Sequence, residues 1–408
     1  MRRVAVTGIG VVSPLGVGAE AFFEALAAGR SGIRVLAIDA PRPLATRIGA
    51  AVDFNAGEHF PAPKARMLDR VSQFALVAAA EAIAQSQGAL HGDRARMGVF
   101  VGTGMGGAQT TDESYRTLYE SGSDRLKPFS VLLAMANAPC AWIALEHGIA
   151  GPSLSYSCAC ASSAVAIGEA FRSIARGDCD VAIAGGAEAP LTFGTIRAWE
   201  ALRTLAAEDP HDPSASCKPF SKDRSGLVLG EGAAMFVLED RDRAAARGAT
   251  ILAEVAGYGI CTDATHITRP TAEAQSRAMR LAMEDARLSP AQVGYVNAHG
   301  TGTEANDGVE TAALHAALAD RAKDIPVSST KSMHGHLLGA AGALEFAAAL
   351  QALRKQVLPP TMHLAQPDPA CDLDYVANAA RRVPAFEAVL SNSFAFGGTD
   401  AVIAARAA

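Results

Sequence analysis

Short β-branched runs alternate with alanine-rich helical stretches along the first half of the chain. The predicted strands are 4–7, 97–102, 153–157 and 181–184, and the predicted helices are 19–28, 71–86 and 162–176. This alternation is typical of a mostly parallel sheet that is covered by helices on both faces. Because the helices carry small residues on most sides, we expect them to be buried, in more than two layers.

The same alternation restarts after a charged, glycine-containing stretch at 240–249. A strand at 233–238 precedes this stretch, and a polar, proline-containing loop is predicted between 206 and 223. The elements predicted after it are strands at 251–255, 295–298 and 389–393 and helices at 272–286, 308–318 and 337–353. Two halves of similar pattern suggest a duplicated α/β unit, divided near residue 245 into 1–245 and 246–408, although no residue-level repeat is visible.

Composition narrows the class of protein. The 408 residues are 50% apolar and 19% charged, which excludes a disordered chain and a disulfide-stapled miniprotein. The formal net charge of −6 argues against a nucleic-acid partner. Seven cysteines without regular spacing fit a reducing compartment. A start of Met1-Arg2-Arg3 resembles a signal peptide, but the apolar stretch after it contains two glycines and favours a buried first strand.

No uninterrupted apolar run reaches the roughly 18 residues that a membrane helix requires. The nearest candidate, His336–Leu353, carries Glu345 in its middle and is predicted to be a core helix. We therefore expect a soluble, cytoplasmic protein with no membrane association.

The segment Gly102–Gly107 fits G-x-G-x-x-G and follows a predicted strand, which by itself suggests a dinucleotide site. The residues after it are polar, and no strand ending in an acidic residue follows about 20 positions later. A dehydrogenase is therefore the weakest interpretation. We predict a glycine turn that lets the backbone pass close to another group.

Cys158-Ala-Cys160 has two chemical interpretations. Zinc would need a second pair of ligands at a recognisable spacing, and none is present. Cys160 also lies where a strand turns into a small-residue helix, and the N-terminus of a helix favours a thiolate and offers N–H groups to an oxyanion. From its position alone, Cys160 is as well explained by an inert buried cysteine as by a nucleophile.

Three polar segments in the second half carry candidate catalytic groups. They are Asn297–Thr303, which contains His299, Ser329–His336, which contains Lys331, and Asn392–Gly398. A single histidine at a strand end is usually structural. Two histidines, one in a Gly-Thr context and one after Lys-Ser-Met, are hard to explain by packing alone.

Taken together, these motifs resemble those of the β-ketoacyl-[acyl-carrier-protein] synthases, condensing enzymes of the thiolase-like fold, and most closely their elongating type II members. The matching segments occur in order over nearly the whole chain: Val6–Gly10, Gly151–Ser153, Cys160–Ser163, Gly185–Glu188, Arg224–Gly226, Gly230–Gly232, His299–Thr301, Lys331–Met333 and Phe394–Gly398. The resemblance implies an α/β fold of duplicated halves in αβαβα layers. It also implies decarboxylative Claisen condensation of a malonyl group with an acyl group carried on Cys160, in fatty-acid or polyketide and polyene elongation.

The resemblance assigns catalytic roles to four residues. Cys160 would be acylated, and His299 and His336 would hold the malonyl thioester carbonyl and stabilise the enolate. Lys331 would hold the histidine loop as the ion-pair partner of Glu345. Acidic residues in supporting positions are Asp307 and Glu310.

Substrate contacts follow from the same resemblance. The backbone N–H groups of Cys160 and Phe396 would form the oxyanion hole, and Phe396 would be a gate hinged at Gly397 and Gly398. The remaining matches are Thr301 and Thr303 for the pantetheine arm, Met105 for the acyl tunnel, and Phe394 for the substrate.

Partners are implied as well. The substrates would arrive on the phosphopantetheine arm of acyl carrier protein, with no resident cofactor or metal. An acidic carrier needs a local basic patch on a chain of net charge −6. The positions that match docking residues are Lys64, Arg66, Arg70 and Arg203, with Arg125 and Lys127 as a possible extension. The apolar segment Pro128–Trp142 is expected at the interface of a homodimer, or of a heterodimer with a chain-length-factor subunit.

Two positions depart from the family pattern, and two rival functions stay open. His334 replaces a threonine and Asp400 replaces an asparagine. We expect His334 to fill space; the alternatives are an altered protonation of the site and a specialised lineage such as polyene or nodulation-type acyl synthesis. A biosynthetic thiolase would carry a second catalytic cysteine in a Cys-x-Gly context, where this chain has Phe394–Gly398. A non-catalytic chain-length factor would normally lack the nucleophile.

Overall fold

The computed structural model describes residues 1–408, and one sheet of 11 strands runs through them. The strand order is β11-β10-β14-β15-β9-β1-β8-β7-β5-β6, with β2 added beside β1. The bounds of these strands are β1 Val4–Ser13, β2 Gly16–Val17, β5 Met97–Gly102, β6 Ser153–Tyr156, β7 Val181–Glu188, β8 Gly232–Asp240, β9 Ala253–Thr262, β10 Val293–Asn297, β11 Val327–Ser328, β14 Ala388–Phe394 and β15 Thr399–Arg406.

Two short antiparallel strand pairs lie outside this sheet: β3 Arg34–Val35 with β4 Ile48–Gly49, and β12 Val357–Leu358 with β13 Arg381–Arg382. The helices are α1 Ala19–Ala27, α2 Ala62–Ala65, α3 Arg70–Gln85, α4 Ala108–Tyr119, α5 Ser130–Ala134, α6 Ala138–His147, α7 Ser162–Arg176, α8 Phe193–Leu202, α9 Arg241–Ala246, α10 Ala272–Ala286, α11 Asp307–Leu318, α12 Lys331–His334 and α13 Ala341–Lys355. No helix among them is long and apolar enough to cross a bilayer.

The sheet consists of two topologically equivalent halves. In the first half β5 pairs parallel with β6 and β7, and β7 continues antiparallel through β8 to β1. In the second half β10 pairs parallel with β11 and β14, and β14 continues antiparallel through β15 to β9. The halves join where β1 pairs antiparallel with β9. The duplication that the sequence pattern suggests is therefore visible as a repeat of topology.

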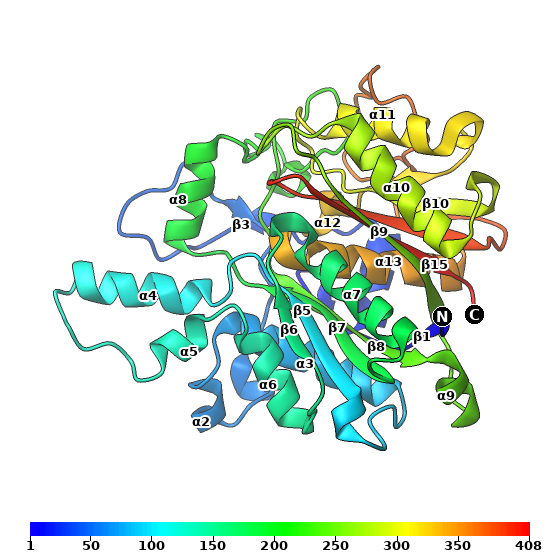
Figure 1. Cartoon of the computed structure of the whole chain (residues 1–408). Helices are drawn as coiled ribbons and strands as arrows, with labels where there is room; N and C mark the ends of the chain where they lie inside the picture. Colours follow the sequence, from blue (N-terminus) through cyan, green and yellow to red (C-terminus); the bar gives the residue numbers. More distant parts are fainter.

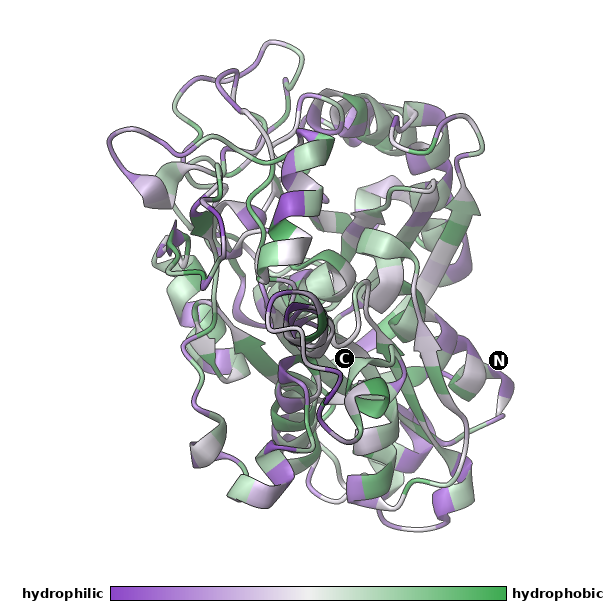
Figure 2. Cartoon of the chain, turned by 90° about the vertical axis from the view of Figure 1, so that its left-hand side faces the viewer, coloured by the Kyte–Doolittle hydropathy of each residue, from purple (hydrophilic) through white to green (hydrophobic).

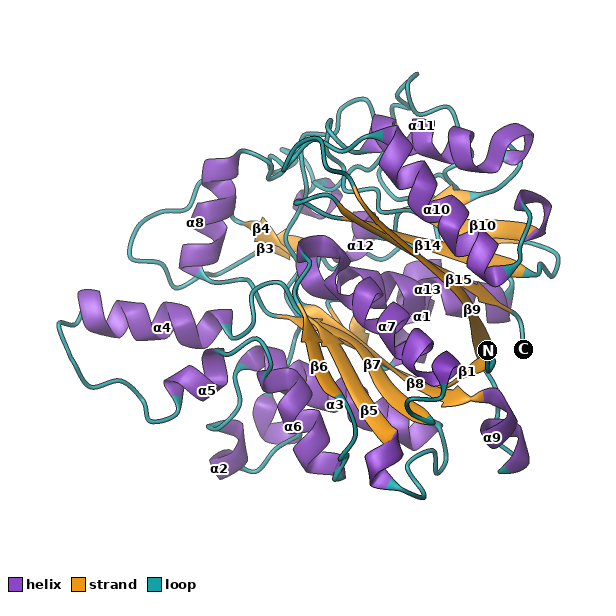
Figure 3. Ribbon diagram, in the orientation of Figure 1, coloured by secondary structure: helices purple, strands orange, loops and turns teal.

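Helices α7 and α13 lie between the two halves of the sheet, and α3, α6, α10 and α11 cover the outer faces (Figure 3). Every residue of α13 from Ala341 to Leu353 is buried. Small residues make this central layer possible, because a Cβ on Gly342 would lie 2.6 Å from the Ser393 hydroxyl oxygen. The result is the expected five-layer αβαβα architecture, with apolar residues concentrated in its interior (Figure 2).

Several helices and strands begin or end at other residues than predicted. β1 extends to Ser13 and β9 runs from Ala253 to Thr262 instead of 251–255, because β9 pairs with β15 along its length. The first residues of the predicted helix 337–353 form a 3-10 turn, and α13 starts at Ala341. β6 is exposed, with Leu154 48% accessible, because it is a free edge of the sheet.

The glycine motif Gly102–Gly107 does connect a strand, β5, to a helix, α4. Its backbone N–H groups nevertheless bind the protein itself: Gly104 and Met105 donate to the carboxylate of Glu188, at 2.6 and 3.0 Å. Helix α4 then projects with α5 from the body instead of packing on the sheet (Figure 1). The anion position of a dinucleotide site is thus taken by a buried side chain.

Candidate active site

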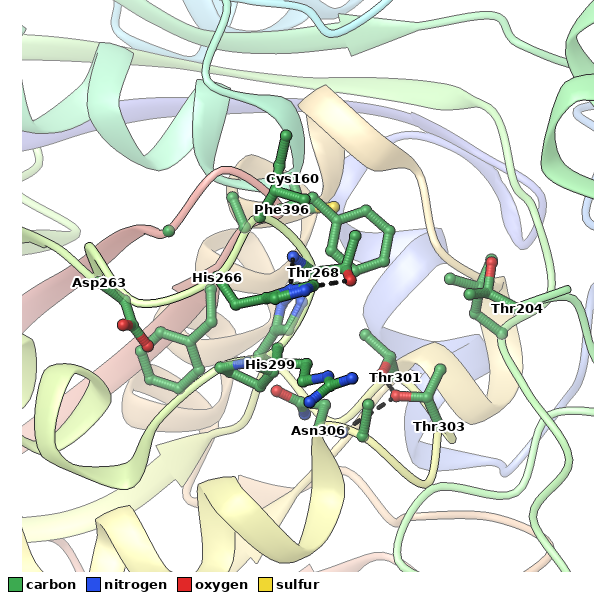
Figure 4. A pocket seen from close by; sticks show the side chains of 18 of the residues that line it. Cys160, Thr204, Asp263, His266, Thr268, His299, Thr301, Thr303, Asn306 and Phe396 are labelled. Carbon is green, nitrogen blue, oxygen red and sulfur yellow. Dashed lines mark hydrogen bonds between the residues drawn. The ribbon is translucent and has the colours of Figure 1, made fainter. Parts of the chain in front are cut away.

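Loops at strand ends of both halves meet in one cavity of about 240 Å³ (Figure 4). Cys160 comes from the turn between β6 and α7, and His299 from the turn after β10. His336 follows α12, and Phe394 to Gly398 form the β14–β15 turn. Other residues lining the cavity include Trp199, Thr301, Thr303, Asp263, His266, Ile267, Asn306 and Asp400.

Cys160 occupies a strained turn ahead of α7. Ala159, just before it, has a φ of +46°, a conformation that side chains other than glycine rarely adopt. The Cys160 sulfur is buried and lies 3.0 Å from Nε2 of His336. Burial raises the pKa of the thiol to about 12, while the charge of Lys331 and the backbone N–H of Phe396 act in the opposite direction. Burial thus outweighs the groups that favour the thiolate and keeps the sulfur protonated in the closed site.

His299 is fixed by its neighbours on both sides. Its backbone N–H and that of Gly300 donate to the carboxylate of Glu310, at 2.8 and 2.7 Å. The ammonium of Lys331 donates to the His299 carbonyl oxygen at 2.6 Å and lies 3.5 Å from Nδ1 of the ring. Because an ammonium can only donate, Nδ1 is the acceptor and the ring hydrogen sits on Nε2, toward the cavity.

The charge of Lys331 is compensated inside the protein. Its ammonium forms an ion pair with Glu345, and neither side chain is accessible to solvent. Burial raises the pKa of Glu345 to about 7. Asp307 supports the next turn, since it accepts from the backbone N–H of Phe220 at 2.8 Å and of Gly302 at 3.3 Å.

The two cavity histidines are neutral and converge on the cysteine. Burial and the charge of Lys331 lower the pKa of both His299 and His336 well below the ordinary value. Their rings meet edge to face with centroids 5.4 Å apart. The ligand-type atoms of Cys160, His299 and His336 all lie within 4.8 Å of one another. The Nε2–H donor of His299 and the neutral ring of His336 thus face the space in front of one thiol.

The β14–β15 turn closes this space. The ring of Phe396 stacks on Trp199, with centroids 6.0 Å apart, and Phe394 packs edge-on against His299 at 6.0 Å. Gly397 and Gly398 have φ of +88° and +82°, so a flexible turn carries the aromatic ring. The hydroxyls of Thr301 and Thr303 bond to each other at 2.8 Å on the opposite wall.

His334 takes no part in the cavity. It is fully buried, its Nδ1 donates to the carbonyl oxygen of Gly335 at 2.7 Å, and its Nε2 accepts from the hydroxyl of Thr330 at 2.9 Å. Burial lowers the pKa of His334 to about 3. With both ring nitrogens used by neighbours, the side chain fills space.

Some predicted site residues are not brought together. Met105 is 44% exposed and lies outside the cavity. Arg70 does not present a free charge: its guanidinium makes two hydrogen bonds to the buried carboxylate of Glu231, at 2.6 and 3.0 Å. Lys64 is paired with Glu146 at 2.5 Å, whereas Arg66 and Arg203 are exposed and unpaired. Helices α2 and α8 also lie apart in one chain (Figure 1).

The sequence patterns missed two parts of the site, Trp199 and the loop 263–270. This loop contributes Asp263, His266 and Ile267 to the cavity wall. It follows β9 as the other site loops follow their strands, so a polar segment after a strand was the available signal. Misplacing the end of β9 at 255 concealed it.

A cysteine in a strained strand-to-helix turn that faces two neutral histidines, on a duplicated five-layer α/β fold, defines a condensing enzyme of the thiolase-like class. The family models "Beta-ketoacyl synthase, N-terminal domain" and "Beta-ketoacyl synthase, C-terminal domain" match residues 1–244 and 252–365. The chain belongs to the β-ketoacyl synthase family and is an acyltransferase that elongates acyl chains by condensation in fatty-acid or polyketide synthesis.

Individual relatives are similar to this chain over nearly its full length. Nodulation protein E of Rhizobium leguminosarum bv. trifolii is 42% identical over 406 residues, covering 99% of both chains. 3-oxoacyl-[acyl-carrier-protein] synthase 2 of Staphylococcus aureus is 40% identical, covering 98% of this chain and 97% of its own. Two solved structures superpose with TM-scores of 0.91 over 100% of this chain and 99% of theirs: the AntDE:AntF complex of an acyl-carrier protein with its ketosynthase, at 32% identity, and the ishigamide ketosynthase/chain length factor, at 33%.

Proposed function

We propose that Cys160 accepts the acyl chain as a thioester. The sulfur attacks the carbonyl carbon of the incoming acyl thioester, the carbon–sulfur bond to pantetheine breaks, and the thiol proton leaves with the pantetheine sulfur. His336, 3.0 Å from the sulfur, is the nearest group that can relay this proton. The backbone N–H groups of Cys160 and Phe396 stabilise the tetrahedral oxyanion.

His299 and His336 then act on the malonyl donor. Loss of carbon dioxide leaves an enolate whose negative charge develops on the thioester oxygen, and two imidazole N–H donors in a dry site stabilise it. The enolate carbon attacks the acyl carbonyl carbon on Cys160, a carbon–carbon bond forms, and the Cys160 sulfur departs as the thiolate, which takes up one proton from solvent to restore the thiol. These steps use only side chains and backbone groups of this chain and the substrate thioesters, so we propose no resident cofactor or metal.

The observation that carries this proposal is the convergence of Cys160, His299 and His336 within 4.8 Å, with both rings neutral. The test separates the two half-reactions. Cys160→Ala should abolish condensation and leave malonyl decarboxylation measurable, whereas His299→Ala and His336→Ala should lose decarboxylation. His334→Thr is the matched control, because this buried histidine lies outside the cavity. Chain extension by Cys160→Ala would refute the nucleophile.

We also propose that the substrates arrive on an acyl carrier protein, as in the solved AntDE:AntF complex. The hydroxyls of Thr301 and Thr303 on the cavity wall would bond the pantetheine amides. Arg66 and Arg203 are exposed cations without an acidic partner, and Lys64 exchanges Glu146 for the carrier. Arg70 is excluded from this docking set by its bonds to Glu231. The seven free cysteines support a reducing, cytoplasmic setting.

A dimer is the assembly that the exposed surface supports. β6 is a free edge of the sheet. Phe129, just before α5, and Val131 and Leu132 within it are exposed by 53%, 72% and 54%. The second half of the segment Pro128–Trp142 packs instead on the chain's own core. We propose a two-fold partner on β6 and α5, either a second copy or a chain-length-factor subunit like that named in the ishigamide structure.

A further inference from the structure

The turn that carries Phe396 is fastened to the loop 263–270. The backbone N–H of Gly397 donates to the carbonyl of Ile267 at 2.8 Å, and that of Asp263 donates to the carbonyl of Gly398 at 2.7 Å. A Cβ on Gly398 would lie 2.1 Å from the Asp263 carbonyl oxygen, so the two backbones are in direct contact. Phe396 can therefore leave Trp199 only if the loop moves or separates from the turn.

Asp400 lies two residues beyond this turn, near the start of β15. It is 2% exposed, lines the cavity, and its Oδ2 has no hydrogen-bond partner. A buried carboxylate without a donor is unfavourable as an anion. Burial raises the pKa of Asp400 to about 8, and the charges of Asp263 and Glu310 act in the same direction.

Titratable or charged groups face Asp400 from most of the elements around it, while β14 places Phe394 opposite it and the loop also brings His266 and Arg269 to the shared cavity wall. The neighbouring strand β9 places Cys261 opposite it, the loop contributes Asp263, α11 contributes Glu310 and α10 contributes Arg277. Burial raises the pKa of Cys261, so this thiol adds no charge at neutral pH. Arg277 is the cation whose charge lowers the pKa of Asp400.

Asp263 differs from Asp400 because it has donors. Burial raises the pKa of Asp263, but hydrogen bonds from Thr265 and Thr271 outweigh burial and lower it overall. Its Oδ2 accepts from the backbone N–H of Thr271 at 2.6 Å. The two neighbouring carboxyl groups are thus driven to opposite states, Asp263 as the anion and Asp400 as the acid.

We propose that Asp400 is a positioning residue for the gate: as the neutral acid it lets the Phe396 turn rest against the charged Asp263 loop, and its ionisation drives turn and loop apart. The proton goes to solvent, and no covalent bond changes. This inference rests on the proposed function and on the role of Phe396 as its gate, and it adds that opening of the gate is coupled to the release of one proton.

The coupling has a definite pH dependence. The closed site holds the proton up to a pH of about 8, whereas a solvated aspartate loses it near pH 4. Between these values the equilibrium constant for opening rises with pH, by up to about tenfold per pH unit, and above about pH 8 it levels off.

Alkylation of Cys160 by N-ethylmaleimide reports on this equilibrium, because Cys160 is only 6% exposed and the Phe396 turn lies against its sulfur in the closed site. The rate is followed by mass spectrometry in the intact chain, in a Cys158→Ala background, and compared with the same chain carrying Asp400→Asn, which keeps the shape and cannot ionise. Dividing the two rates at each pH removes the titration of the thiol itself. The ratio should rise by up to about tenfold per pH unit from about pH 6 and level off near pH 8. A ratio constant within twofold over this range would overturn the proposal.

A second variant tests the same idea from the other side. Arg277→Gln removes the one cation that lowers the pKa of Asp400, and Arg277 is an exposed residue outside the cavity. The plateau should move to higher pH with an unchanged slope; an unmoved plateau would contradict the assignment. Since alkylation requires neither acyl transfer nor condensation, loss of enzyme activity with an intact pH profile would refute the proposed function and leave this inference standing.

Discussion

Substituting Glu345 by glutamine should lower both the free energy of unfolding and the rate of malonyl decarboxylation, and a further substitution should restore only the first. The change keeps the shape of the side chain and removes the counter-charge of Lys331. Both residues are fully buried, and the carboxylate has no neutral donor, so the ammonium is its only partner. After the change the ammonium retains only the His299 carbonyl oxygen at 2.6 Å and Nδ1 at 3.5 Å.

The size of the effect follows from this burial. Breaking a buried ion pair from one side costs about 3–5 kcal/mol, so the free energy of unfolding should fall by that amount. Without the Glu345 carboxylate the ammonium is no longer held in place beside Nδ1 of His299, so the ring hydrogen is no longer kept on Nε2. Losing one oriented donor to the enolate should lower malonyl decarboxylation by about 10²- to 10³-fold.

Denaturant unfolding and a carbon dioxide release assay measure the two effects. The matched control is Glu20→Gln, which breaks the exposed pair with Lys355 and should cost less than about 1 kcal/mol. The double change Lys331→Met with Glu345→Leu should recover most of the stability, because an apolar pair of similar volume replaces the ions. Decarboxylation should stay low in the double variant. A recovered rate of decarboxylation in the double variant would show that Lys331 does not orient His299.

Three further predictions concern His334, carrier docking and assembly. His334→Thr should lower the rate of condensation less than about tenfold, or 1.4 kcal/mol of barrier, without moving the pH–rate profile; a displaced profile would contradict the space-filling role. Folding lowers the pKa of His334, so its contribution to the free energy of unfolding is present above about pH 6.5 and is lost as the pH falls. Between about pH 6.5 and pH 3 the free energy of unfolding of the unsubstituted chain should therefore decline by about 1.4 kcal/mol per pH unit relative to that of His334→Thr. Arg66→Glu and Arg203→Glu should each raise KM for carrier-bound substrates and leave turnover of a pantetheine thioester mimic unchanged; equal losses with both substrates would exclude docking. Val131→Arg should convert the proposed dimer to monomers, as measured by light scattering, and an unchanged mass would exclude α5 from the interface.

The chain order of motifs sufficed to identify the class of fold and the chemical groups. Alternating strands and helices, a cysteine at a strand-to-helix turn and polar segments after strands are local features, and each follows from a few neighbouring residues. Cys160, His299, His336 and Lys331 were found in this way. The repeat of topology between the halves was indicated by the same local alternation.

What only the tertiary structure decided depends on burial and on contacts between distant segments. The thiol of Cys160 has a raised pKa because the whole fold buries it, and no local pattern carries that information. Arg70 looks like a free surface cation until Glu231, 161 positions away, binds it. The loop 263–270 joins the gate only through backbone hydrogen bonds to Gly397 and Gly398. Desolvation and long-range pairing are properties of the packed chain, so they set the charge states that the sequence left open.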